Sequence, residues 1–113
     1  MVYTQQDRYA AAAQEDRSAR RSRISIPATL RPSGSKSFQT AVRDLSLAGF
    51  SATAMSAIPP RTMCWLTFPE SAPRQAKVVW WENGLVGCAF EQLLEQPELE
   101  AMLARWNGDG RLR

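Results

Sequence analysis

Two clusters of polar residues in the N-terminal half of the chain carry side chains suited to an anionic ligand. Arg17 and Arg21 stand four residues apart, and Asp44, Ser46 and Gly49 follow in an Asp-x-Ser-x-x-Gly pattern. Two guanidinium groups can clamp phosphate oxygens and bond the O6 and N7 edge of guanine. A carboxylate could accept the N–H donors of that base, a hydroxyl could bond phosphate or base, and glycine lets the backbone come close. These few residues could thus bind the edge of a guanine base and a phosphate group, and could let the backbone approach the ligand.

Each cluster by itself is also typical of an ordinary surface. A loop rich in arginine is usually solvated, and Asp-x-Ser followed by glycine is a common turn whose side chains bond their own backbone. What favours a site is the order of the two clusters along the chain. The first lies just ahead of a predicted strand and the second lies between two predicted strands.

The residue composition excludes several chemistries. The chain of 113 residues has no histidine, which excludes histidine acid–base catalysis. Cys64 and Cys88 each lie in an apolar run, so we expect reduced core thiols and no metal site. No stretch approaches the ~20 apolar residues of a membrane helix, and the N-terminus lacks the apolar core of a signal peptide. We therefore expect a cytoplasmic protein that does not insert into membranes.

Charge is distributed unevenly along the chain. The net charge is +3, but residues 1–43 carry eight basic and three acidic side chains, whereas residues 44–113 carry six basic and eight acidic ones. The excess of arginine near residues 17–43 indicates an anionic partner, whether a nucleotide, nucleic acid or membrane phosphate. The acidic C-terminal half and the scarcity of lysine count against nucleic acid.

Alternating apolar and polar residues predict six short strands. Turn signals separate them at near-regular spacing, including the Asn83-Gly84 pair of a tight hairpin, and Pro27 indicates an edge position or a bulge in the first strand. This pattern predicts an all-β protein, a six-stranded antiparallel β-barrel that closes on itself. The predicted strands cover residues 24–31, 38–44, 49–54, 65–68, 75–81 and 85–90.

A helix is predicted after the last strand, at about residues 97–106. Pro97 suits its first position, and Glu98, Glu100 and Arg105 complement the helix dipole. An apolar face at helical spacing should pack on the barrel. We expect a flexible tail at residues 1–14, one domain at residues 15–107 and a second tail at residues 108–113. The apolar face consists of Leu99, Met102, Leu103 and Trp106.

The stretch from about Asp16 to Phe90 resembles a PilZ domain. The resemblance rests on the Arg-x-x-x-Arg and Asp/Asn-x-Ser-x-x-Gly motifs and on the opening and closing strands. It implies a six-stranded β-barrel with a C-terminal helix that binds cyclic di-GMP, the arginine loop wrapping the ligand against the barrel. The matching residues are Arg17 and Arg21; Asp44, Ser46 and Gly49; Ile24, Ile26, Pro27 and Ala28; and Val86 to Phe90.

By this resemblance, the ligand-binding residues are Arg17, Arg21, Asp44, Ser46 and Gly49. Further contacts could come from Arg20, Arg23 and Trp80. Asp16 could form ion pairs with the arginines. The pair of arginines that binds the ligand could also be Arg17 with Arg20 or Arg23. Trp80 and Trp81 are consecutive in a strand and must point to opposite faces, one into the core and the other able to stack on a guanine.

The resulting hypothesis is a non-enzymatic cyclic di-GMP receptor without other cofactors. Ligand binding would order the arginine loop and signal to an unidentified downstream protein. One alternative is an adaptor of the same fold that does not bind nucleotide. Another is a small barrel that binds nucleic acid.

Overall fold

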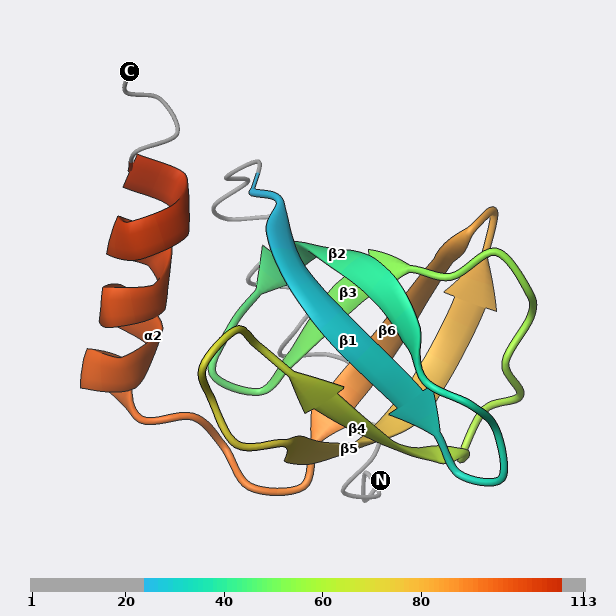
Figure 1. Ribbon diagram of the computed structural model, residues 1–113. Coiled ribbons are helices and arrows are strands. Elements are labelled where there is room, and N and C mark those ends of the chain that lie inside the picture. The colour runs from blue at the N-terminus through green and yellow to red at the C-terminus, as the bar shows by residue number, and fades with distance from the viewer. Residues whose placement is uncertain (1–23, 109–113) are drawn as a thin grey trace, which may run out of the picture.

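The computed structural model describes residues 24–108 and shows a closed antiparallel β-barrel of six strands with a helix beside it (Figure 1). Around the barrel the strand order is β1-β2-β3-β6-β5-β4, so every neighbouring pair is hydrogen-bonded and the sheet returns to its first strand. The predicted fold class is confirmed. The strands are β1 (Ile26–Pro32), β2 (Phe38–Leu45), β3 (Gly49–Thr53), β4 (Met63–Thr67), β5 (Arg74–Glu82) and β6 (Leu85–Phe90).

The predicted strand positions agree with this barrel except at a few ends. β1 begins two residues later than predicted, at Ile26. β4 begins two residues earlier, at Met63, and ends one residue earlier, and β5 is longer by one residue at each end. Pro27 lies in the part of β1 that pairs with β2 alone, because pairing with β4 begins only at Thr29. The proline is therefore at a local edge of the sheet, as its missing N–H requires.

Alternating residues of all six strands fill the barrel with one apolar core. Ile26, Leu30, Val42 and Leu66 are fully buried there, and the rings of Phe50 and Phe90 pack with their centroids 5.3 Å apart. Both cysteines are free thiols in this core, with 3.9 Å between the sulfur atoms of Cys64 and Cys88. The prediction that both cysteines lie in the core is confirmed.

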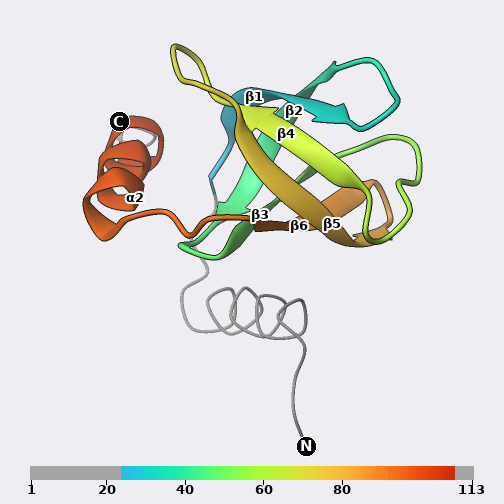
Figure 2. The ribbon, with the colours of Figure 1, turned by 90° about the horizontal axis from the view of Figure 1, so that it is seen from below.

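Helix α2 (Gln96–Leu103) stands beside the barrel, and the chain continues through one π-helical turn, η1 (Ala104–Gly108) (Figure 2). Pro97 occupies the first turn, as predicted. The predicted apolar face packs against the core and stays half-buried, since α2 contains no fully buried residue. Ion pairs from Glu98 to Arg74 and from Arg105 to Glu70 add polar contacts to the barrel.

Candidate ligand-binding face

The Asp-x-Ser-x-x-Gly segment forms the turn between β2 and β3. Ser46 is buried in this turn, and its hydroxyl donates to the carbonyl of Gly49 at 3.3 Å. The same oxygen accepts the backbone N–H groups of Ala48 and Gly49 at 3.3 and 3.2 Å. One donor and two acceptor positions of the hydroxyl are thus in use. Ser46 therefore contributes by holding the turn.

Gly49 begins β3 at a place where no side chain fits. A Cβ atom at this position would overlap the backbone carbonyl of Cys88 on β6. The reason for glycine is therefore the close approach of the neighbouring strand. The turn is also bonded to the end of β6 and to the linker after it, because the carbonyls of Ala48 and Leu47 accept the N–H groups of Phe90 and Leu94 at 2.8 and 2.9 Å.

Asp44 lies at the end of β2 and is held by a hydrogen bond across to β3. The hydroxyl of Ser51 donates to Oδ2 of Asp44 at 2.6 Å. The other carboxylate oxygen has no hydrogen bond among the described residues. A carboxylate fixed at one oxygen presents the other as an acceptor with little loss of side-chain freedom on binding.

Two irregularities in the sheet bring Asp44 and Trp80 to the outside of the barrel. The β2–β3 register shifts between Val42 and Asp44, and the β5–β6 register shifts between Val78 and Trp80. Val42 and Val78 both point into the core. Strict alternation would place Asp44 and Trp80, two positions later, inside the barrel as well. A β-bulge adds one residue to the strand, so the side chains that follow it point to the opposite faces.

As a result, four residues form one row across the outer face of the barrel. In the sheet register Asp44 pairs with Ser51, Ser51 pairs with Gly87, and Gly87 pairs with Trp80. Residues opposite each other in antiparallel strands point to the same face. With strands ~4.8 Å apart, the row spans about 14 Å from carboxylate strand to indole strand. Gly87, in the middle of the row, has no side chain.

The two adjacent tryptophans have different environments. The indole of Trp80 lies over Gly87, where a Cβ atom would overlap the ring. Trp81 packs against the core, and its Nε1 donates to the carbonyl of Ala54 at 2.9 Å. The expectation that one tryptophan belongs to the core and the other to the surface is confirmed.

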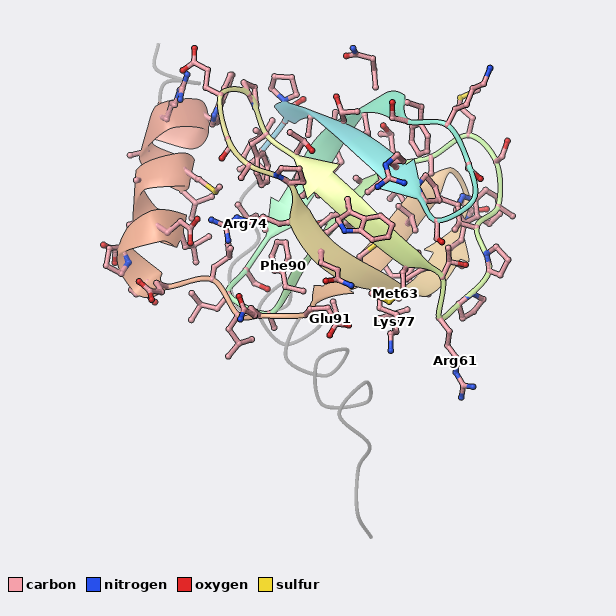
Figure 3. All side chains as sticks on the ribbon, turned by 60° about the horizontal axis from the view of Figure 1, so that its bottom comes forward. Arg61, Met63, Arg74, Lys77, Phe90 and Glu91 are labelled. Carbon is pink, nitrogen blue, oxygen red and sulfur yellow. The ribbon has the colours of Figure 1, made fainter. Side chains whose placement is uncertain are left out.

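Lys77 brings a positive charge next to this row. It pairs with Ala89 on the outer face of β5, beyond the bulge from Trp80, and it forms no ion pair among residues 24–108. Figure 3 shows its side chain extending away from the barrel beside Met63. The arginines expected to bind the ligand, Arg17 and Arg21 with Arg20 and Arg23, lie outside the described residues.

Sequence reasoning missed two members of the row, Ser51 and Gly87. Ser51 alternates with the apolar residues of its strand, so the sequence indicates which face of the sheet it lies on. The sequence does not indicate which residue of the neighbouring strand it pairs with. Its pairing with Asp44 depends on the bulge in β2, and the place of Gly87 under an indole depends on the bulge in β5. Neither bulge has a glycine or proline at its position to mark it in the sequence.

Other site types find no support in the part of the chain that the structure describes. Residues 24–108 contain no cluster of three side chains able to hold a metal ion. They also contain no helix of the length and apolarity that crossing a membrane requires.

Comparison with protein families shows that residues 15–106 match the model of the PilZ domain. The match includes both polar motifs, all six strands and most of the helical segment. A comparison with curated proteins gave no match.

Proposed function

Because the chain belongs to the PilZ domain family, whose domains are receptors for cyclic di-GMP, we propose that it binds cyclic di-GMP on the outer row of the barrel. The observation that carries the proposal is the alignment of Asp44, Ser51, Gly87 and Trp80 across four strands. A row with a carboxylate at one end, an indole at the other and a glycine between them suits a flat, hydrogen-bonding ligand.

The chemistry of the row fits a guanine nucleotide. The free oxygen of Asp44 can accept the N1–H and N2–H groups of a guanine. The indole of Trp80 offers an aromatic plane on which a base can stack, and each such stack contributes ~1–3 kcal/mol. Gly87 leaves room for the Trp80 indole to lie against the sheet.

The arginine segment supplies the remaining contacts in this proposal. By the family motif, Arg17 and Arg21 clamp phosphates and guanine edges, while Arg20 and Arg23 add charge and further contacts. Ordering this segment costs conformational entropy, which the charge-assisted hydrogen bonds must exceed. Ser46 and Gly49 contribute through the shape of the turn that presents Asp44.

The proposed output is conformational. PilZ domains are binding and adaptor domains rather than enzymes. We propose that the arginine segment closes on the ligand and changes the surface that a downstream protein reads. Ligand binding and signalling would then be coupled by the difference in affinity of that protein for the two surfaces.

Calorimetry tests the proposal directly. Cyclic di-GMP should bind the full chain, whereas GMP and short single-stranded DNA should bind far more weakly. Arg21→Ala and Asp44→Ala should each weaken binding about tenfold or more, since each removes charge-assisted bonds. Trp80→Ala should weaken it by roughly 5- to 150-fold through lost stacking. Ser51→Ala should have a smaller effect, because it only frees the Asp44 side chain.

Trp65→Ala is the matched control, because Trp65 lies on β4 with the guanidinium of Arg31 over its ring, 4.4 Å from the centroid. Its removal should leave cyclic di-GMP affinity unchanged. Binding that survives in Arg21→Ala and Asp44→Ala would overturn the site. Absence of cyclic di-GMP binding by a folded protein would favour the adaptor, and preference for single-stranded DNA would favour the nucleic-acid barrel.

A further inference from the structure

A groove of about 620 Å³ lies at the barrel end formed by the β1–β2 and β3–β4 loops. Its walls are largely apolar and include Phe38, Met55, Ile58 and Pro59. Met55, which lines the groove, is 94% exposed. The groove could therefore bury an apolar side chain.

The charges at this groove are all positive. Lys36 is the charged residue of its lining, and Arg61 belongs to the same β3–β4 loop as the lining residues Pro59 and Thr62. Neither cation forms an ion pair with another described residue, and no carboxylate of residues 24–108 lines the groove. Figure 3 shows Arg61 pointing away from the barrel at this end. A segment bearing carboxylates beside an apolar side chain would complement the groove.

The chain itself carries such a segment between β6 and α2. Leu93 is 54% exposed and stands between Glu91 and Glu95, both exposed. The backbone on either side is held in place, because Glu91 N–H donates to Gln75 at 2.9 Å and Leu94 N–H donates to Leu47 at 2.9 Å. Leu93 is thus a fixed apolar knob flanked by two negative charges.

Met55 and Leu93 are the exposed large hydrophobic residues of the described part of the chain, and they lie in opposite charge environments. They also lie at opposite ends of the barrel. The knob is bonded to the β2–β3 turn, whereas the groove contains Phe38, at the other end of β2. Figure 1 shows the knob linker at the lower left and the β3–β4 loop at the right. A molecule cannot fill its own groove with its own knob.

We propose that the groove receives the Leu93 knob of a second copy of this chain. Glu91 and Glu95 of one copy meet the cations around the groove of the next, while Leu93 packs beside Met55. The contact joins two different surfaces, so it is head-to-tail and leaves one knob and one groove free at the ends of each assembly. One anchor side chain makes a contact smaller than the ~1,200 Å² of stable interfaces, so association is weak. It does not require cyclic di-GMP.

Sedimentation velocity of the full chain, without ligand, tests this association. The weight-average mass should rise above 12.6 kDa with protein concentration and fall with added salt, because the contact joins opposite charges. Leu93→Asp and Met55→Asp should each be monomeric at all concentrations. Both positions are exposed, so the variants should fold, as circular dichroism would show. Arg43→Glu is the control, with an exposed cation that does not line the groove, and it should associate normally.

Mixing the two variants distinguishes the head-to-tail contact from any other. Leu93→Asp keeps its groove and Met55→Asp keeps its knob, so the mixture should form dimers and nothing larger. Lys36→Glu should weaken association, and Glu91→Lys with Glu95→Lys in that background should restore it. A wild-type protein that stays monomeric, association that survives Leu93→Asp, or a mixture without dimers would overturn the proposal.

Discussion

The indole of Trp80 on β5 lies over Gly87 on β6, in the space that a side chain at Gly87 would occupy. Trp80 is half-buried, and its ring packs on the sheet at Gly87. A glycine that accepts a neighbouring aromatic ring in this way compensates for its own missing side chain in a strand. The pair links stability of the barrel to the proposed binding face.

Gly87→Ala should therefore displace the indole. The added methyl group meets the end of a side chain rather than backbone, so the ring can give way at a cost of about 1 kcal/mol in the free energy of unfolding. Urea denaturation and the tryptophan emission spectrum measure the two effects. In a Trp80→Ala background the same substitution should be nearly neutral. Equal losses in both backgrounds would show that the ring does not occupy this space.

Gly49→Ala should be more harmful, because the overlapping group is the carbonyl of Cys88. The β3–β6 pairing would have to shift, and we expect a loss of about 1–3 kcal/mol in urea denaturation. Gly34→Ala is the comparison, with no atom within 4 Å but a φ of 81°, which costs ~1 kcal/mol. Asparagine should recover stability at position 34, where it tolerates this φ, but not at position 49. Recovery at position 49 would contradict the steric explanation.

The stability of the barrel should decrease at alkaline pH because of Cys88. Its hydrogen bond with Cys64 and its burial raise the pKa of this thiol well above the ordinary value. Above about pH 8.5 the unfolded chain loses the thiol proton while the folded chain keeps it, so the unfolded state binds fewer protons and stability falls with pH. Each further pH unit costs up to about 1.4 kcal/mol until the folded thiol titrates.

Urea midpoints from pH 7 to 10 measure this dependence. Cys88→Ala should be less stable at pH 7, because it leaves a cavity, but its stability should fall less steeply at high pH. Parallel pH curves for the two proteins would assign the alkaline loss to other groups.

Glu98→Gln should loosen helix α2 from the barrel. Arg74, its ion-pair partner, is about two-thirds buried, and its Nε atom is buried without a hydrogen-bond partner. Removing the carboxylate leaves the partly buried charge of the guanidinium without its ion-pair partner, which lowers the free energy of unfolding by about 1 kcal/mol. Hydrogen exchange should become faster in residues 96–106 and stay unchanged in the barrel. Glu100→Gln, which alters an exposed residue of the same helix, should change neither region.

Much of the fold could be predicted from the sequence because its signals are local. Alternation marks the core residues of each strand, and Asn83-Gly84 and Pro97 mark a hairpin and a helix start. The composition of the candidate site could be predicted in part, since Asp44 lies in a short motif. The geometry of the site could not be predicted, because Asp44 and Trp80 point out of the barrel only as a result of two bulges. A bulge is a property of the pairing between strands, which the alternation within one strand does not contain.

The same limit applies to Ser46. Its motif suggests a hydroxyl that meets a ligand, and the structure shows a second role, because the same oxygen bonds to the turn that the motif forms. Short polar motifs often combine residues that contact a ligand with residues that fix the backbone. Only the hydrogen-bond partners of each residue distinguish those that contact a ligand from those that fix the backbone.

The position of Pro27 has a consequence for how copies of this chain can meet. A closed barrel offers few unpaired backbone groups, and the stretch of β1 that pairs on one side only contains a residue without an N–H. That stretch is a poor template for adding a strand from another molecule, which is the usual route to amyloid-like aggregation. Contacts between copies that use side chains, such as the one proposed above, do not depend on such an edge.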